Sequence, residues 1–298
     1  MKAVSALALS AALLLGLASC ARKPAGGGES GDELPSNLIR VMTFNIMQSS
    51  GEPEGHEWAS VRKGPCIAMF KDVAPDIVCI QEARKLQCSD LYSALPEYSQ
   101  IKHPLDNVES NGGQRNLILY KSSKFELLSW DKFWFSEDGT ASGPRWGDAA
   151  TTQRLTVFAR LRHKPTGSEF WVYDAHFFDK CNYGTTPPHC VSMCLESIDA
   201  QAGPDGTVFL CGGFGLRPGD AVMRPLFNSL GHAATEAPES DGASAVTYNA
   251  LGENQGAALD HIFFRGAEAL SYKVADSPSA YGTRWISDHY PVYADFLL

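Results

Sequence analysis

The sequence lacks an excess of positive charge. Its 298 residues include 25 Lys and Arg against 34 Asp and Glu, which gives a formal net charge of −9. Proteins that hold duplex DNA neutralise its phosphates with a basic surface, so this balance argues against duplex DNA as a partner. The 27 glycines and 17 prolines are spread along the chain, which excludes collagen-like and low-complexity proteins. With 44% hydrophobic and 20% charged residues, the composition is that of a globular domain.

Long apolar runs are also scarce, and the one clear example stands at the N-terminus. Lys2 precedes a nearly unbroken apolar stretch from Ala3 to Leu17, which is too short for a membrane span and typical of a signal peptide. The sequence Leu-Ala-Ser-Cys that ends at Cys20 resembles the bacterial lipobox, so we expect residues 1–19 to be removed and Cys20 to be lipidated. An ordinary signal peptide with a chance cysteine is the alternative. Residues 20–37 then form a flexible tether, and the protein is anchored in the bacterial cell envelope, at the outer membrane or cell surface.

No paired C-x2-C motif of a structural zinc site is present. Cys181, Cys190 and Cys194 lie in one polar stretch, where the sequence favours a disulfide over a metal cluster. Cys79 and Cys211 lie inside apolar runs that are typical of strands, so we expect them to be packed thiols.

From residue 38 onward, short apolar runs alternate with helical or loop segments. A helix is expected over 61–73. Segments 117–120 and 125–129 are expected to pair through a Lys-Ser-Ser turn, and 155–162 is expected to form a hairpin with 169–175. The other expected strands are 39–44, 76–82, 207–211, 259–264 and 291–296. Because no linker divides 38–298, we predict one α/β domain with two packed sheets, and a monomer.

Several of these strands begin or end at a polar residue that could contact a metal or a phosphate. Each residue taken alone has a plain structural explanation, such as a turn former or a solvated strand end. Together they suggest a site, because catalytic residues of α/β folds gather at strand ends. The residues are Asn45, Glu82, His176, Asp260, Asp288 and His289.

The order of the motifs around these residues resembles the endonuclease/exonuclease/phosphatase superfamily. The motifs are Thr43-Phe44-Asn45, Ile80-Gln81-Glu82, Asp174-Ala175-His176, Leu259-Asp260-His261-Ile262-Phe263 and Ser287-Asp288-His289-Tyr290-Pro291-Val292, with Thr247-Tyr248-Asn249 as a secondary match. The resemblance covers residues 38–298. It implies a four-layer α/β/β/α sandwich of two mixed sheets with the site at one edge of both sheets.

The resemblance also implies a metal site. Glu82, helped by Asn45, would bind Mg2+ or Mn2+, which are hard cations that prefer oxygen ligands. The reaction would be attack of a metal-assisted water on a phosphodiester or phosphomonoester.

The remaining roles fall to two histidines and two aspartates. His289 would be the general base or a phosphate contact, oriented by Asp288. His176 would donate to a phosphoryl oxygen, and Asp260 would lie near the metal and the attacking water.

One family motif is broken. Where the family has Gly-Asp-Phe-Asn, this chain has Gly212-Gly213-Phe214-Gly215, so glycine replaces both the carboxylate that positions the attacking water and the amide that stabilises the transition state. Asp174 also stands where the family has asparagine. The sequence therefore leaves two functions open. One is a phosphoesterase of low or altered activity acting on a small phosphoester, a sugar phosphate, a lipid headgroup or a nucleotide. The other is a pseudoenzyme that binds a phosphorylated ligand or a protein partner.

Overall fold

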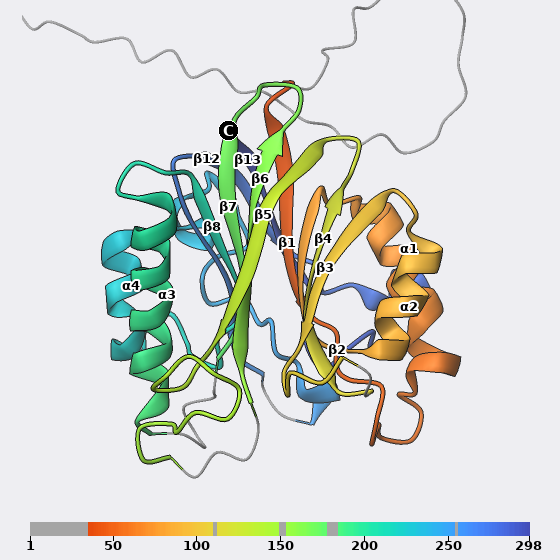
Figure 1. The fold of residues 1–298 in the computed structure, drawn as a ribbon. Helices are drawn as coiled ribbons and strands as arrows, with labels where there is room; N and C mark the ends of the chain where they lie inside the picture. Colours follow the sequence, from red (N-terminus) through yellow and green to blue (C-terminus); the bar gives the residue numbers. More distant parts are fainter. Residues whose placement is uncertain (1–34, 110–111, 149–152, 178–183, 254–255) are drawn as a thin grey trace, which may run out of the picture. The chain divides into compact units, whose positions relative to one another are not determined.

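The computed structural model describes residues 35–109, 112–148, 153–177, 184–253 and 256–298. One compact unit spans Pro35–Leu298. Within this unit two mixed β-sheets pack face to face, and helices cover the outer face of each sheet (Figure 1). The predicted fold class, a four-layer α/β/β/α sandwich, is confirmed.

Sheet A has seven strands in the described part of the chain, in the order β10-β12-β13-β1-β2-β4-β3. Their bounds are β1 Leu38–Asn45, β2 Ile77–Arg84, β3 Tyr98–Pro104, β4 Gln114–Lys121, β10 Glu239–Ser240, β12 Glu268–Val274 and β13 Val292–Leu297. β1 and β2 are parallel neighbours, and β13 pairs antiparallel with β1. Both faces of β1 and β2 are covered, which explains why their sequences are continuous apolar runs rather than alternating ones.

Sheet B has six strands among the described residues, in the order β5-β6-β7-β8-β11-β9. Their bounds are β5 Phe125–Trp134, β6 Leu155–His163, β7 Glu169–His176, β8 Val208–Gly213, β9 Gly231–His232 and β11 Asp260–Arg265. The predicted hairpin between β6 and β7 is confirmed. β7 and β8 are parallel, and β11 runs antiparallel to β8.

Helices on the two outer faces make the crossovers between the parallel strands. Helix α1 (Lys63–Val73), entered through the π-helical turn η1 (Trp58–Arg62), links β1 to β2, and α3 (Thr186–Ala202) links β7 to β8. Two βαβ units result, one in each sheet, so the carboxyl ends of the two strands in each pair lie at the same edge. The other helical segments are α2 Lys85–Ala94, α4 Arg224–Ser229, α5 Ala233–Glu236, η2 Ala221–Met223, η3 Ala250–Gly252 and η4 Pro278–Tyr281.

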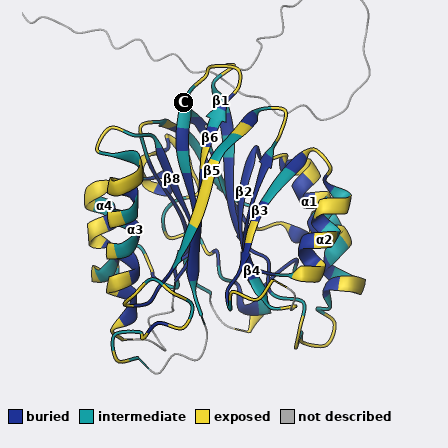
Figure 2. Cartoon of the chain, viewed as in Figure 1, coloured by how far each residue is buried: buried dark blue, intermediate teal, exposed yellow. Residues whose placement is uncertain are grey.

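The core has three layers of apolar packing. The largest lies between the sheets, where the rings of Phe209 on β8 and Phe296 on β13 are 4.9 Å apart. A second layer packs α1 and α2 on sheet A, and a third packs α3 and α4 on sheet B. Figure 2 shows the result, with buried strands inside and exposed outer faces on the helices. This packing holds the strand ends that carry the site.

One local prediction is wrong, and one helix was not predicted. Segments 117–120 and 125–129 form strands, but β4 belongs to sheet A and β5 to sheet B, so the Lys-Ser-Ser turn carries the chain from one sheet to the other. The polar stretch with Cys190 and Cys194 is the first half of helix α3, which begins near two prolines and ends at Gly203. Proline at the first helical positions and glycine after the last turn are usual helix boundaries, and this signal was available in the sequence.

The cysteines of the described residues are buried. Cys79 and Cys211 are free thiols packed between the sheets, as predicted. A disulfide that uses Cys194 is wrong, because Cys194 is a free thiol whose Sγ lies 3.8 Å from Thr156 Oγ1. Cys181 lies outside the described residues.

No helix in the described ranges is both long enough and apolar enough to span a membrane. The predicted signal peptide, the predicted lipidation site Cys20 and most of the predicted tether lie outside the described residues.

Candidate functional site

The polar strand ends of the two sheets meet at one edge of the sandwich. Asn45 is the last residue of β1, and Glu82 lies near the end of β2. In sheet B, Gly213 is paired with His176 on one side and with Asp260 on the other. The two sheets are joined at this edge, because His176 Nε2 lies 3.8 Å from Glu82 Oε1. The structure therefore brings together residues from five separate segments of the chain.

His289 is held by Asp260. Its Nδ1–H donates to Asp260 Oδ2 at 2.7 Å, and the hydroxyl of Thr247 donates to the same oxygen at 2.6 Å. The prediction that Asp288 orients His289 is wrong, because the carboxylate that contacts the imidazole is Asp260. Asp260, which was expected only to lie near the metal and the attacking water, therefore positions His289. With Nδ1 engaged, Nε2 is the ring nitrogen that remains for a substrate.

Asp288 serves a different purpose in the loop before β13. Ser287 Oγ lies 2.7 Å from the carbonyl oxygen of Asn45 and 3.1 Å from Asp288 Oδ1, and it also accepts from the backbone N–H of His289 at 3.1 Å. On the other side, the N–H of Asn249 donates to the carbonyl of Asp288 at 2.8 Å. These contacts fix the loop between the end of β1 and the segment around Thr247, so the imidazole of His289 is held in place.

Glu82 is presented by an irregular backbone. The pairing of β2 with β4 shifts register between Ile80 and Ala83, and Glu82 has a φ of 66° in the left-handed region. A non-glycine residue in this region is uncommon and often marks a functional position. Asn45 Nδ2 donates to Glu82 Oε1 at 3.2 Å, and Asn45 Oδ1 accepts from the N–H of Met47. Asn45 thus helps Glu82 by holding its carboxylate.

The two histidines have opposite protonation tendencies. Burial lowers the pKa of His289, but Asp260, Asp288 and Glu82 outweigh it and raise the pKa from 6.5 to about 9. Burial lowers the pKa of His176 well below 6.5, and the positive charges of Arg154 and His289 add to the effect. At neutral pH the site therefore holds one imidazolium and one neutral imidazole.

The charge on His289 gives a stability prediction for the protein without divalent cations. The raised pKa means that the folded state holds this proton more tightly than the unfolded chain, which stabilises the fold by about 3 kcal/mol below pH 6.5. This contribution is lost as the pH rises to 9, so the free energy of unfolding in urea should fall over that interval. His289→Gln should flatten the slope, and the exposed His189→Gln should not. An equal slope in all three proteins would contradict the assignment.

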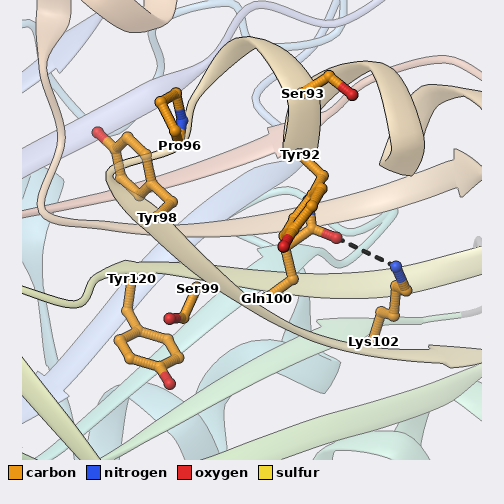
Figure 3. A pocket seen from close by; sticks show the side chains of 8 residues that line it. All are labelled: Tyr92, Ser93, Pro96, Tyr98, Ser99, Gln100, Lys102 and Tyr120. Carbon is orange, nitrogen blue, oxygen red and sulfur yellow. Dashed lines mark hydrogen bonds between the residues drawn. The ribbon is translucent and has the colours of Figure 1, made fainter.

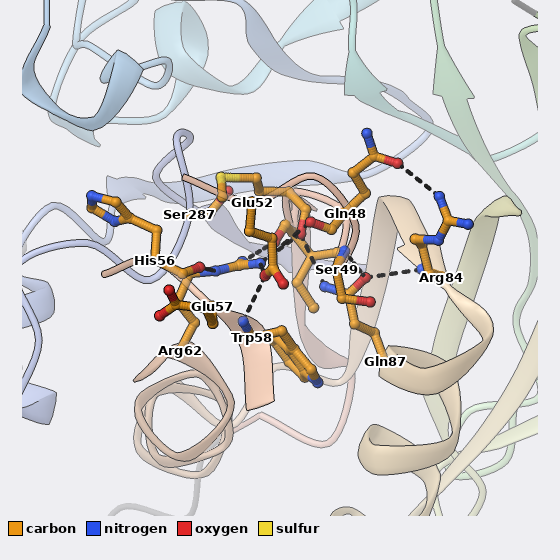
Figure 4. Close-up of polar contacts among 12 residues, drawn as sticks. Gln48, Ser49, Glu52, His56, Glu57, Trp58, Arg62, Arg84, Gln87 and Ser287 are labelled. Carbon is orange, nitrogen blue, oxygen red and sulfur yellow. Dashed lines mark hydrogen bonds and ion pairs between the residues drawn. The ribbon is translucent and has the colours of Figure 1, made fainter. Parts of the chain in front are cut away.

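A buried arginine that the sequence analysis did not single out supports the site. Arg62, at the end of η1, has a fully buried guanidinium that donates to the carbonyl oxygens of Ile46, Met47 and Ile286 at 2.8, 3.1 and 3.1 Å. Its Nη2 also pairs with Glu52 at 2.5 Å (Figure 4). Arg62 therefore ties the segment after β1 to the segment that leads into Ser287. Its signal in the sequence is weak, because a single arginine in a helical turn usually faces solvent.

Comparisons with known proteins identify the family of the chain. A family model described as the endonuclease/exonuclease/phosphatase family matches residues 42–289, which is most of the chain. The chain belongs to this family. Among curated protein sequences there is no significant match.

Solved structures share the family fold. An endonuclease/exonuclease/phosphatase from Bacteroides vulgatus is 24% identical, with 88% of this chain and 99% of that chain covered and a TM-score of 0.78. A mannosyl-6-phosphatase from Bacteroides thetaiotaomicron is 22% identical, with 87% and 100% covered and a TM-score of 0.77. The human Nocturnin catalytic domain, with a bound sulfate anion, is 21% identical, with 87% and 94% covered and a TM-score of 0.68.

Members of this family generally depend on a divalent metal. In the described part of the chain, no three His, Cys, Asp or Glu side chains form a group that could enclose a metal ion. Mg2+, however, is often held by one or two carboxylates while it keeps several waters. The side chain of Glu82 is 19% exposed and is held by Asn45, so this donor set fits a hydrated Mg2+ but not a cage of protein ligands.

The two glycines of the expected family motif lie at the end of β8. Gly213 ends β8 and Gly215 follows two residues later, so neither position offers a side chain to the site. Gly215 has a φ of 62° in the left-handed region, whereas Gly213 lies outside that region. The site therefore has polar side chains around His289 and Glu82, and the end of β8 contributes none at positions 213 and 215.

A separate surface groove lies beside the edge strand β3. It has a volume of about 790 Å3 and is lined by residues of α2, β3 and β4 (Figure 3). Tyr92 is 64% exposed on its rim, and Lys102 Nζ donates to Gln100 Oε1 at 3.1 Å. The groove shares no residue with the site described above.

Proposed function

We propose that this protein is a metal-dependent phosphoesterase of reduced or altered activity, anchored outside the cytoplasm by a lipid on Cys20. The observation that carries the proposal is the Asp260–His289 pair, which lies with His176 and Glu82 at one edge of the two sheets. Two imidazoles of different charge and a carboxylate at a strand end are the groups that phosphate-ester hydrolysis requires. The substrate class is a small phosphoester, with sugar phosphates tested first because one structural relative is a mannosyl-6-phosphatase.

Each residue has a role that follows from its contacts. A bound Mg2+ or Mn2+ would supply Lewis-acid stabilisation of the phosphoryl oxygens, and Glu82 would hold it. His289, charged at neutral pH and fixed by Asp260, would donate from Nε2 to a phosphoryl or leaving-group oxygen. His176, neutral because it is buried, would offer a second hydrogen bond without adding charge.

A second function is favoured by the end of β8. With glycine at 213 and 215, the site lacks the side chains that would position water and stabilise the transition state. A loss of one such stabiliser usually costs about 10²–10³ in rate. The alternative is therefore a pseudoenzyme that binds a phosphorylated ligand or a protein partner through the remaining charged groups.

The two functions are separated by an activity screen of the purified protein. We expect slow hydrolysis of sugar phosphates such as mannose 6-phosphate, of nucleotides or of glycerophosphodiesters that needs Mg2+ or Mn2+ and stops in EDTA. Glu82→Gln should abolish the metal-dependent rate, because it removes the carboxylate that would hold the cation. The control is Glu97→Gln, which makes the same charge change at an exposed loop residue. Activity that survives both EDTA and Glu82→Gln would refute the metal assignment, and no activity on any phosphoester would favour the pseudoenzyme.

The lipid anchor has its own test. The wild-type protein is expected to enter the detergent-rich phase in a detergent partition experiment, and Cys20→Ala is expected to stay in the aqueous phase, because several acyl chains are needed for stable anchoring. Equal partition of the two forms would rule out lipidation at Cys20.

A further inference from the structure

The space that a side chain of Gly213 would take at the end of β8 is tight and is bordered by polar residues. A Cβ atom on this residue would lie 3.3 Å from Asp260 Oδ1, 3.7 Å from His176 Cδ2 and 3.9 Å from Gln81 Oε1. We call this space the Gly213 hollow. Gly213 and its neighbours are almost entirely buried, with exposed fractions of 1% for Asp260, 0% for Gln81 and 7% for His176.

The two oxygen atoms that face the hollow have no partner among the described residues. Asp260 Oδ1 and Gln81 Oε1 are both buried and accept no hydrogen bond. The donors that reach Asp260, from Thr247 and His289, both bind its other oxygen, Oδ2. A buried acceptor without a donor is costly, so two such atoms around one space indicate a ligand that donates to both.

Asp174 explains why Gln81 turns its oxygen toward the hollow. Gln81 Nε2 donates to Asp174 Oδ1 at 2.7 Å, and it also lies 3.2 Å from the carbonyl oxygen of Cys79 and 3.0 Å from Thr43 Oγ1. The carbonyl of Cys79 can only accept, so it fixes the amide nitrogen on its side, and Asp174 accepts from the same nitrogen although burial raises the pKa of this carboxyl. The amide oxygen must then point the other way, into the hollow. The other carboxyl oxygen of Asp174, Oδ2, accepts a hydrogen bond from the N–H of Leu117 at 3.0 Å.

We propose that the Gly213 hollow is a binding site for a small hydrogen-bond donor. One water molecule occupies it by donating to Gln81 Oε1 and Asp260 Oδ1. Asp174 sets the preference for a donor through the orientation of Gln81. The water joins two buried networks into one. It connects the amide of Gln81 to the carboxylate that holds His289, so both oxygens of Asp260 are fixed. The hollow accepts a donor and rejects an acceptor, because its two facing atoms are an anionic and a carbonyl oxygen.

The preference can be reversed at a residue that does not line the hollow. In Asp174→Asn, the new amide can still accept from the N–H of Leu117 with its oxygen while its nitrogen donates to Gln81. The new amide at position 174 then competes with the Cys79 carbonyl for the orientation of Gln81, and a Gln81 amide that rotates presents its nitrogen to the hollow. A carboxylate at position 213, which is repelled in the wild type, would gain a donor in this background.

The first test is a high-resolution crystal structure of the purified wild-type protein. We expect one water within about 3 Å of both Gln81 Oε1 and Asp260 Oδ1. A dry hollow would overturn the proposal. A metal ion at shorter distances there, or a rotated Gln81 that donates to Asp260, would overturn it equally.

The second test is a thermal-melting comparison at position 213. Gly213→Ala fills the hollow with a methyl group, so its melting temperature should fall by about 3–6 °C as the water is lost. Gly213→Ser adds the same Cβ together with a hydroxyl that can donate to Asp260 Oδ1, so it should melt several degrees above the alanine variant. A serine variant that melts at or below the alanine variant would contradict a hollow that needs a donor.

A mutant cycle then tests the control by Asp174. Gly213→Asp is expected to lower the melting temperature by about 5 °C or more in the wild type, and by less than half of that in the Asp174→Asn background. Gly213→Ala is the matched control, and its cost should not be relieved by Asp174→Asn. Equal costs of Gly213→Asp in both backgrounds would refute the role of Asp174. If Asp174→Asn does not fold, the crystal structure and the alanine–serine comparison still decide whether the hollow holds a donor.

Discussion

A variant that carries both Gly213→Asp and Gly215→Asn is expected to hydrolyse phosphoesters about 10²-fold faster than the wild type, or more. The reason is that both a carboxylate that positions water and an amide that stabilises the transition state would return to a site that still holds the Asp260–His289 pair. The backbone permits the change. Gly215 has a φ of 62°, a conformation that asparagine tolerates better than most residues, and Gly213 lies outside the left-handed region.

The side chain at 213 must also fit its surroundings, which include two oxygen atoms that have no hydrogen-bond donor. A carboxylate there would meet Asp260 Oδ1 and Gln81 Oε1, so the double variant should gain further when Asp174→Asn is added. We expect the triple variant to be both faster and more heat-stable than the double variant. A triple variant that is no more active than the double variant would mean that Gln81 does not control the hollow.

The measurement is the initial rate on the phosphoester panel with Mg2+, with circular dichroism and melting to establish that each variant is folded. Gly219→Asn is the control, because a side chain at that glycine meets no atom within 4 Å and lies outside the site. A folded double or triple variant without any gain on any phosphoester would leave the binding function as the better explanation. A wild type that is already fast with Mg2+ would instead mean that residues 212–215 do not correspond to the broken family motif.

The sequence was sufficient to predict where polar residues meet the strands. Asn45 and His176 end apolar runs, and a polar residue at the end of a buried strand is visible without any tertiary information. Parallel strands bring such residues to one sheet edge, so the general location of the site followed from the fold class.

The partner of His289 could not be predicted in the same way. Asp288 is adjacent in sequence, but its carboxylate lies by the hydroxyl of Ser287, whereas His289 Nδ1 faces Asp260. The observed partner, Asp260, is 29 residues away, and the two segments meet through Tyr248, which bridges to Ala257 on one side and to His289 on the other. The choice between the two aspartates therefore depends on these bridges in the folded protein, which no local pattern encodes.

The role of Gln81 was equally hidden. It precedes Glu82 inside a buried strand, where a glutamine gives no sign of which way its amide turns. That orientation depends on Asp174, 93 residues later in the chain and in the other sheet. The resemblance implies two separate departures, an aspartate at 174 and a glycine at 213, and the structure places both positions beside one amide group, that of Gln81.

Removal of the Arg62 guanidinium is expected to have the largest effect on stability. Arg62→Met should lower the free energy of unfolding by about 3–5 kcal/mol, because it leaves Glu52 and the carbonyl oxygens of Ile46 and Ile286 without their buried donor. Because the total stability of a domain is only about 5–15 kcal/mol, this variant should be close to unfolding at 37 °C. Urea denaturation at 25 °C measures the change. Arg62→Lys should lose less, since an ammonium keeps the charge and some of the donors.

The neighbouring residue provides the control. Lys63 has a side chain that is 38% exposed and lies 3.6 Å from Asp90, so Lys63→Met should cost less than about 1 kcal/mol. The expected loss in Arg62→Met extends beyond stability, because the guanidinium contacts Ile286 just before the loop that holds His289. At temperatures where Arg62→Met is still folded, its pH dependence of stability between 6.5 and 9 should be weaker than that of Lys63→Met. If both variants unfold at the same urea concentration, Arg62 does not anchor the loop, and the position of His289 must be maintained by Ser287 and Asn249 alone.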